Sequence, residues 1–162
     1  MSIVCACSGH RPEKLPWGYD EADPRCVALK QQMEEVLRQL LEGGCHHFLC
    51  GMARGVDLYF AELLLSFREE YPLTLEAVVP CPTQSSGWRR DQRQRYDAVL
   101  AQCDAVTVLE EEYSPGCMLR RNRYMVDRAD MLLTVYDGSS GGTAATVAYA
   151  REKGIGLIPL WR

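Results

Sequence analysis

Two hydrophobic patterns alternate along the chain. Short apolar runs are typical of buried strands, and longer stretches with an apolar residue at every third or fourth position are typical of amphipathic helices. The strand-like runs cover residues 3–7, 46–50, 75–79, 104–109, 131–136 and 157–160. The helix-like stretches cover residues 26–41, 56–67, 88–103 and 118–128, and an Ala-rich stretch after Thr143 ends at Lys153-Gly154. The pattern therefore predicts six strands that alternate with five helices.

This alternation is typical of parallel strands joined by helical crossovers. It predicts an α/β fold, with a Rossmann-like, doubly wound, mostly parallel sheet of about six strands and helices on both faces. The chain has 162 residues, of which 47% are hydrophobic, and this size suits a single domain over residues 1–162. The connection at residues 8–23 is unusually long, so we expect it to form a wall or lid of a site.

Composition narrows the classes of partner. Lys and Arg number 18 against 22 Asp and Glu, which gives a formal net charge of −4. This balance disfavours a surface that grips nucleic acid along its whole length, so we expect nucleic acid to be an unlikely partner. The eight cysteines follow no basic or hydrophobic leader, and we expect reduced thiols and a cytoplasmic protein. No apolar stretch approaches the ~18 residues of a membrane helix, so we expect no membrane partner.

Glycine-rich or polar segments follow three of the predicted strands. They are Ser8-Gly9-His10-Arg11, the segment from Gly51 to Asp57, and the segment from Asp137 to Thr143. In a parallel sheet these segments meet at the carboxyl edge, where ligands bind. Glycines let the backbone approach a ligand, and amides at a helix N-terminus attract anions, so we expect phosphate there. No standard dinucleotide or Walker motif occurs, and Gly51 and Gly55 fit a simple tight turn equally well.

Arginines gather in the two helices that precede the fourth and fifth predicted strands. Eight of the 18 basic residues lie there: Arg89, Arg90, Arg93, Arg95, Arg120, Arg121, Arg123 and Arg128. Most of them fit a solvated helix face. Arg121 and Arg123 directly precede the fifth strand and its glycine loop, so we expect this pair to contact phosphate.

Histidine, cysteine and aspartate offer further candidates. Cys45-His46-His47 with Cys50 suggests metal binding, but alternate residues of a strand point to opposite faces, so we expect no metal site. His10 follows a strand in a polar turn, where it could contact a ligand, transfer a proton or cap the turn. Asp57 and Asp137 could bind a ribose hydroxyl, although Asp57 fits a helix cap at least as well.

Several of these motifs occur in a distinctive order. The order is Ser8-Gly9-His10-Arg11-Pro12, the segment from Gly51 to Asp57, Pro80 with Gln84 and Trp88, Asn122-Arg123 with Met125 and Asp130, and Asp137-Gly138 with Gly141-Gly142-Thr143. This set resembles the SLOG superfamily, the Rossmann-like group that includes the DNA-processing protein A family and the lonely-guy phosphoribohydrolases. Within that group it is most similar to the stand-alone YpsA-type proteins. The resemblance implies a nucleotide site in which Gly141, Gly142 and Thr143 hold phosphate, and often a homodimer.

The lonely-guy enzymes carry Arg-Lys-x-x-Met before the fifth strand and Pro-Gly-Gly-x-Gly-Thr-x-x-Glu after it, with the Arg and Glu as catalytic pair. Here Arg121 matches the arginine, Asn122 replaces the lysine, and Thr146 stands in place of the glutamate. Because a threonine cannot act as a carboxylate acid or base, N-glycosidic hydrolysis is the alternative interpretation, with Arg121 and His10 as catalytic candidates. The DNA-processing relatives share the Gly-x-Ala-x-Gly and Asn-Arg elements, which makes single-stranded DNA binding a third interpretation.

We therefore expect a cytoplasmic module that binds a nucleotide or a nucleotide derivative such as ADP-ribose and acts as a sensor or regulator rather than an enzyme. Any catalysis would be that of a nucleoside-monophosphate phosphoribohydrolase. We expect no required cofactor, a small-molecule nucleotide as ligand and a second copy of the chain as partner. The residues expected at the ligand are Ser8, Gly9, His10, Arg11, Gly51, Ala53, Gly55, Asp57, Arg121, Asn122, Arg123, Asp137, Gly138, Gly141, Gly142 and Thr143.

Overall fold

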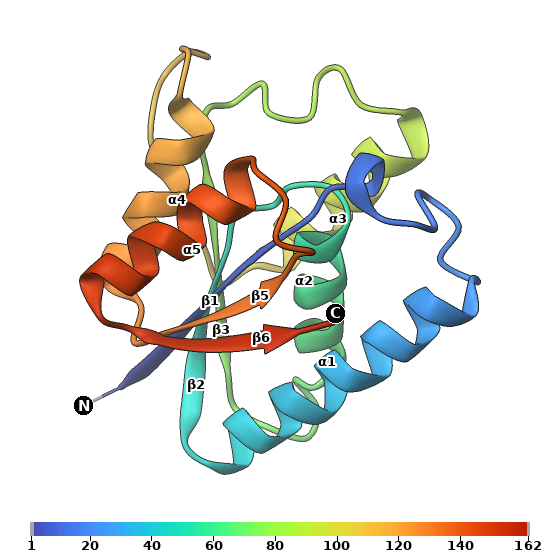
Figure 1. Cartoon of the computed structure of the whole chain (residues 1–162), viewed down its shortest axis with the longest axis vertical. Helices are drawn as coiled ribbons and strands as arrows, with labels where there is room; N and C mark the ends of the chain where they lie inside the picture. Colours follow the sequence, from blue (N-terminus) through green and yellow to red (C-terminus); the bar gives the residue numbers. More distant parts are fainter. Residues whose placement is uncertain (1, 162) are drawn as a thin grey trace.

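The predicted strands form one six-stranded parallel sheet in the computed structural model, which describes residues 2–161 (Figure 1). The strands are β1 (Ile3–Gly9), β2 (Cys45–Cys50), β3 (Thr74–Val79), β4 (Ala105–Val108), β5 (Met131–Val135) and β6 (Gly156–Leu160). The helices are α1 (Pro24–Glu42), α2 (Val56–Ser66), α3 (Arg90–Gln102), α4 (Cys117–Arg128) and α5 (Gly142–Lys153). The predicted α/β, Rossmann-like fold is confirmed.

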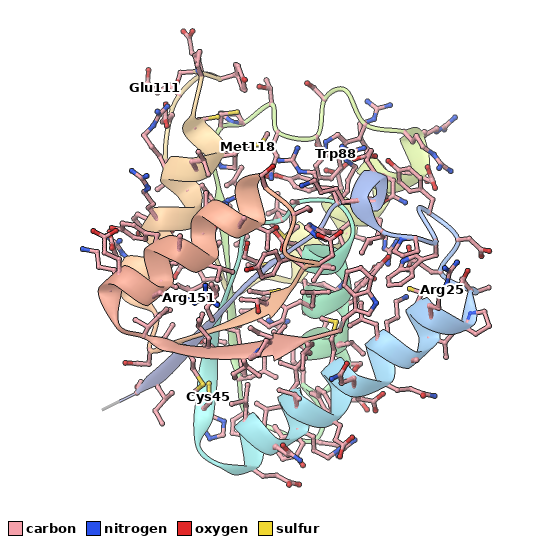
Figure 2. All side chains as sticks on the ribbon, viewed as in Figure 1. Arg25, Cys45, Trp88, Glu111, Met118 and Arg151 are labelled. Atoms are coloured by element: carbon pink, nitrogen blue, oxygen red, sulfur yellow. The ribbon has the colours of Figure 1, made fainter. Side chains whose placement is uncertain are left out.

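Alternate residues of the strands enter two separate cores. Cys5 and Cys7 of β1 pack into a core with α1, α2 and α3, whereas Ala6 packs into a second core with α4 and α5. Leu132 and Leu133 of β5 divide between the two cores in the same way. This period of two follows from the pleat of a strand. Figure 1 shows α4 and α5 on one face of the sheet and α1 to α3 on the other, and Figure 2 shows side chains filling both layers.

The strand order creates a crevice at the centre of the sheet. The order is β4-β3-β2-β1-β5-β6. Strands β2 to β4 follow one another on one side of β1, and β5 and β6 lie on the other side of β1. Cys5 aligns with Met131 and Gly9 with Val135 along this central pair. The segment after β1 leads to α1 on one face, and the segment after β5 leads to α5 on the other face. Such a reversal point is where open α/β sheets bind ligands.

The long connection after β1 is an ordered segment rather than a free loop. It contains a short 3₁₀ helix (Pro12–Lys14) that the hydrophobic pattern did not predict. The Trp17 indole N–H donates to the Tyr59 hydroxyl at 3.1 Å. Arg95 of α3 pairs with both Glu21 and Glu62, which ties the end of this segment to α2. We call residues 10–23 the wall segment, because these anchors hold it above the carboxyl edge of the sheet.

Two boundaries differ from the predicted ones in an informative way. The predicted helix 88–103 begins only at Arg90, because the amide of Trp88 closes a turn onto the carbonyl of Ser85. The Trp88 ring (Figure 2) still packs against Tyr96, with centroids 5.2 Å apart, which produces the helix-like spacing. Strand β4 ends at Val108, and the side chains of Val106 and Val108 remain exposed.

Two further findings concern the chain as a whole. Within residues 2–161, no helix is both long and apolar enough to cross a membrane. All eight cysteines are free thiols, and seven of them are buried. Burial raises the pKa of the Cys7 and Cys50 thiols well above the ordinary value, so neither is a reactive thiolate.

Candidate functional site

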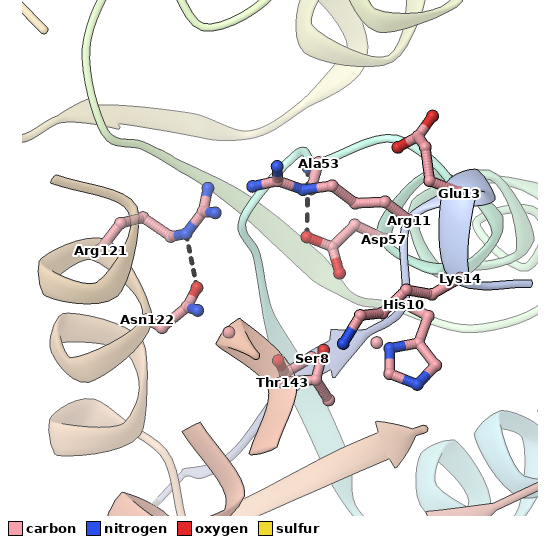
Figure 3. Close-up of a pocket in the computed structure, with 12 residues that line it drawn as sticks. Ser8, His10, Arg11, Glu13, Lys14, Ala53, Asp57, Arg121, Asn122 and Thr143 are labelled. Carbon is pink, nitrogen blue, oxygen red and sulfur yellow. Dashed lines mark hydrogen bonds between the residues drawn. The ribbon is translucent and has the colours of Figure 1, made fainter. Parts of the chain in front are cut away.

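A cavity of about 330 Å³ lies at the carboxyl edge of the sheet, where the segments after β1 and β5 separate (Figure 3). The residues that line it come from both halves of the sequence. They are Ser8, Gly9, His10, Arg11, Glu13, Lys14, Ala53, Asp57, Arg121, Asn122, Gly142 and Thr143. Most of the residues that the sequence predicted therefore meet here, although they lie far apart along the chain, because the segments that follow parallel strands lie at the same edge of the sheet.

Arg121 of α4 is a buried cation at one side of this cavity, with only 2% of its surface exposed. Its Nε donates to Asn122 Oδ1 at 2.7 Å, and its Nη1 donates to the carbonyl of Gly51. Among residues 2–161, no carboxylate oxygen lies within 4.0 Å of this guanidinium. Burial lowers the pKa of Arg121, while the charge of Asp57 opposes that shift. The guanidinium is therefore desolvated without a paired anion.

Gly51 makes the position of Arg121 possible. A β-carbon at residue 51 would lie 2.8 Å from Cζ of Arg121. The Gly51 carbonyl accepts hydrogen bonds from both Arg121 and the Gln84 amide. Gly51 therefore orients the arginine and does not line the cavity itself, although the sequence placed it among the residues at the ligand.

Asp57, in the first turn of α2, is a buried carboxylate on the cavity wall. Its Oδ2 accepts from the backbone N–H of Ala53 at 3.1 Å, and its Oδ1 has no hydrogen-bond partner within the described residues. Burial raises the pKa of Asp57 to about 6, while the charge of Arg121 and the bond from Ala53 act in the opposite direction. The side chain braces the loop before α2 with one oxygen and leaves the other unpaired.

His10 connects the two segments that border the crevice. Its Nε2 lies 3.0 Å from Asp137 Oδ1 and 3.1 Å from the Asp137 backbone nitrogen. An unprotonated Nε2 accepts from the backbone N–H, and a protonated Nε2 donates to the carboxylate. Hydrogen bonds from Ser139, followed by the one from His10, hold the pKa of Asp137 well below its usual range. His10 thus fixes the start of the glycine loop and also borders the cavity.

Positive groups gather at the open side of the cavity. The first turn of α5 contributes Gly142 and Thr143, and a helix N-terminus carries partial positive charge. Lys14 of the wall segment reaches over this turn, where its Nζ donates to Ser139 Oγ at 3.2 Å and to the carbonyl of Ser140. Arg11 is exposed and also lines the cavity. The sequence predicted a wall from this segment but not the individual contributions of Glu13 and Lys14.

Besides Gly51 and Gly55, four predicted residues lie outside this cavity. Arg123 projects from the exposed side of α4, where its guanidinium lies 5.2 Å from the centre of the Tyr149 ring. Asp137 and Gly138 border a separate cavity near Trp161. Gly141 precedes α5 with a φ of 144° and lies beneath the Lys14 ammonium. Arg121 and Arg123 therefore do not form a joint clamp, because residues two apart on a helix point in different directions.

Gly55 supports the turn rather than the ligand site. Its φ of 81° is in the left-handed region, and a β-carbon there would lie 2.7 Å from the carbonyl oxygen of His10. The amide of Val56 donates to the same carbonyl. Gly55 therefore lets the loop before α2 pack closely against the beginning of the wall segment.

Thr146 is a structural residue in the second turn of α5. Its hydroxyl donates to the carbonyl of Gly142 at 2.8 Å and accepts from the side-chain amide of Asn122 at 2.9 Å. It is 2% exposed and does not line the cavity. The position that holds a catalytic glutamate in the lonely-guy pattern here joins α4 to α5. Within residues 2–161, no three His, Cys, Asp or Glu side chains are grouped to hold a metal ion.

Comparisons with known proteins agree on family and fold. A model of the YspA SLOG family matches residues 5–154. A UPF0398 protein of Bacillus anthracis (strain A0248) is 30% identical over 154 residues, which cover 93% of this chain and 83% of that protein. A UPF0398 protein of Bacillus thuringiensis (strain Al Hakam) matches with the same identity and coverage.

Two solved structures of DNA processing protein A share the fold. The protein from Helicobacter pylori, described in terms of its single-stranded DNA binding mode, superposes with a TM-score of 0.68 at 18% identity. The Streptococcus pneumoniae protein gives a TM-score of 0.68 at 14% identity. Both superpositions cover 99% of this chain, but only 66% and 51% of those longer chains. At this level of identity the likeness extends to the fold alone.

Proposed function

The chain belongs to the YspA SLOG family, and we propose that it is a module that binds a phosphate-bearing nucleotide or nucleotide derivative, such as ADP-ribose, in the cavity beside Arg121. It would act as a sensor or regulator whose partner responds to whether the nucleotide is bound. A volume of about 330 Å³ lies at the lower end of the range of ~300–1,000 Å³ for small-molecule pockets. A mononucleotide fits this scale, and a larger derivative would extend through the open side.

The buried Arg121 guanidinium carries this proposal. Burying a charge costs several kcal/mol unless a partner compensates for the lost hydration. Within residues 2–161, the side-chain N–H groups of Arg121 donate to the Gly51 carbonyl and the Asn122 amide oxygen, which are neutral acceptors, and the Asp57 carboxylate acts on the guanidinium without a direct ion pair. A phosphate oxygen in the cavity would supply the missing negative charge through a charge-assisted hydrogen bond.

The surroundings of Arg121 support an anion rather than a neutral ligand. Lys14 and the N-terminus of α5 add positive potential at the open side, and Arg11 adds an exposed cation. The wall segment also carries Glu13, but that carboxylate is engaged by Arg54 at 3.2 Å. The arrangement therefore offers several donors to a phosphate from different directions.

Paired variants on α4 test the proposal. We expect AMP or ADP-ribose to bind the wild-type protein in calorimetry, and Arg121→Gln to weaken that binding by ~10- to 100-fold, since a hydrogen bond to a charged group contributes ~1.5–3 kcal/mol. Arg123→Gln is the matched control, because it removes the same charge from the same helix outside the cavity. Adenosine should be insensitive to both changes. Equal losses for Arg121→Gln and Arg123→Gln would contradict the proposal.

Single-stranded DNA binding is a second candidate function, favoured by the fold shared with DNA processing protein A. That likeness weakens the expectation that nucleic acid is an unlikely partner. The formal charge of −4 argues for a small contact area rather than an extended track. Fluorescence anisotropy with a labelled oligothymidylate decides between the two: binding that AMP does not displace would favour DNA as the ligand.

The phosphoribohydrolase alternative has less support. The hydroxyl of Thr146 is engaged by Gly142 and Asn122, and it has no carboxylate to exchange protons. His10 is held by Asp137 and positions the glycine loop. We therefore do not propose a catalytic pair at this site.

A further inference from the structure

Asp57 has a carboxylate oxygen without a hydrogen-bond partner within residues 2–161, and it lines the same cavity as the hydroxyls of Ser8 and Thr143. That oxygen is Oδ1, and the residue is only 5% exposed. Figure 3 shows this oxygen directed away from Ala53, toward the side of the cavity where Ser8 and Thr143 lie. Leaving a buried carboxylate oxygen unpaired costs free energy, so a donor from a ligand would relieve it.

The floor of the cavity has the chemistry to receive sugar hydroxyls. Ser8 lies near the end of β1 and Thr143 lies in the first turn of α5, and both are at most 9% exposed while lining the cavity. Within the described residues, neither hydroxyl is engaged in a side-chain hydrogen bond. A hydroxyl can donate and accept, whereas a carboxylate only accepts. Together they match a group that offers hydroxyls, and the Asp57 carboxylate would repel a phosphate placed directly on it.

Cationic groups lie beside this floor. Figure 3 shows the Arg121 guanidinium on one side of Asp57 and the Lys14 ammonium turned toward Ser8. The N-terminus of α5 adds its positive end beside Thr143. A ligand with a phosphate and a hydroxyl-bearing sugar satisfies both regions, whereas inorganic phosphate satisfies only the cationic one.

We propose that Asp57 recognises the ribose diol of the bound nucleotide, with Ser8 and Thr143 beside it, so that the site selects ribonucleotides over 2′-deoxyribonucleotides. This inference rests on the proposed function and adds the sugar to it. The discrimination arises because a deoxy sugar leaves the Asp57 oxygen unpaired, whereas a ribose hydroxyl donates to it.

Matched sugar pairs test the inference on the unaltered protein. AMP and GMP, each compared with its 2′-deoxy form, should differ in dissociation constant by ~10-fold or more in favour of ribose. Asp57→Asn retains an oxygen for the Ala53 amide but turns an NH₂ donor toward the cavity, and it should reduce that preference below ~3-fold. Asp97→Asn, an exposed change on α3, is the charge-matched control and should keep the preference.

The outcomes separate the two proposals. Tight but equal binding of the ribo and deoxy forms would overturn the ribose inference and leave the nucleotide site intact. A preference that survives in Asp57→Asn would assign the discrimination to another residue and also overturn it. Failure of all four nucleotides to bind the wild-type protein would instead overturn the proposed function, and the inference would fall with it. The wild-type comparison decides the question even if Asp57→Asn does not fold.

Discussion

Gly51 shows how one residue without a side chain can control a charged group. Its carbonyl accepts from Arg121 and Gln84, and the space above its α-carbon is filled by the guanidinium. Its φ lies outside the left-handed region, so the backbone itself tolerates any residue. Glycine is required here because of the close approach of a neighbouring side chain rather than because of a turn.

Gly51→Ala should therefore weaken nucleotide binding without unfolding the protein. The new β-carbon would lie 2.8 Å from Cζ of Arg121, and the flexible end of that side chain must move. We expect a ~10-fold loss of AMP affinity and a decrease of at most ~1 kcal/mol in the free energy of unfolding. Gly87→Ala is the control, since nothing lies within 4 Å of that site. Undiminished AMP affinity in calorimetry would mean that Arg121 does not bind the phosphate.

Asp57 should make stability depend on pH in the ligand-free protein. Burial raises its pKa from 3.8 to about 6, so between these values the folded state holds a proton that the unfolded chain releases. This contribution to stability is present below pH 4 and is lost as the pH rises through 6, at a slope of at most ~1.4 kcal/mol per pH unit.

Urea unfolding of wild-type protein and Asp57→Asn between pH 5 and 7.5 measures this effect. The difference in unfolding free energy between the two proteins should change across pH 5–6 and level off above pH 7. A difference that stays constant with pH would show that Asp57 titrates near its unfolded value.

Individual residues also show how far the sequence predicts the site. The rule that strand ends meet correctly grouped Ser8, Asp57 and Thr143, since it needs only the order of the elements. Arg121 was expected at the site because it precedes the fifth strand and its glycine loop. It could not separate Arg121 from Arg123, because the rotation of α4 about its axis depends on packing against α5. Lys14 was missed for a related reason: the path of the wall segment is set by tertiary contacts such as Arg54 with Glu13.

At the scale of elements, the N-terminus of α5 combines a permissive backbone with positive potential. Gly142 leaves the entry to the helix unobstructed, because a β-carbon at residue 142 would meet nothing within 4 Å, whereas the Lys14 ammonium lies over Gly141. The Thr146 hydroxyl accepts from Asn122 of α4 and donates to the Gly142 carbonyl, so the turn is held in place from behind. The helix end is thus open toward the cavity and braced on its other side.

Gly142→Asp should separate binding from stability at this helix end. A carboxylate in the first turn interacts favourably with the helix dipole, by ~0.3–1 kcal/mol, so the melting temperature should not decrease. The same charge would repel phosphate, and we expect AMP binding to be lost. Gly142→Ala adds a methyl group without charge and should retain binding within a few-fold. If the Ala variant loses binding as completely as the Asp variant, the effect is steric, and phosphate does not approach this turn electrostatically.

The elements themselves were the most predictable level of the structure. Strands such as β1 and β5 are short, mostly apolar runs, and their burial on both faces makes them easy to recognise in the sequence. The short 3₁₀ helix at Pro12–Lys14 has no hydrophobic period, so the sequence pattern gave no signal for it. The pattern placed the beginning of α3 two residues too early, because the Trp88 ring packs against Tyr96 as a helical residue would, although the Trp88 backbone lies in a turn.

At the scale of the whole molecule, a net negative surface surrounds a local cationic site. The 22 acidic residues outnumber the 18 basic ones, and many arginines outside the cavity are paired, as Arg95 is with Glu21 and Glu62. Long-range attraction for polyanions is therefore weak, and contact at the cavity decides affinity. The expected homodimer stays a prediction, which sedimentation at several protein concentrations would check.

The central position of β1 beside β5 has a mechanical consequence. The chain up to β4 supplies Ser8 and Asp57 to the cavity, and the chain from α4 onward supplies Arg121 and Thr143. A ligand that contacts both sets acts as a cross-link over the seam between the two halves. At a concentration 100 times its dissociation constant it would hold that seam closed by ~2.7 kcal/mol. A partner or protease that binds only the opened seam would thus act more slowly when the ligand is bound, because the opened form is less populated. The shape of the closed form would not need to change.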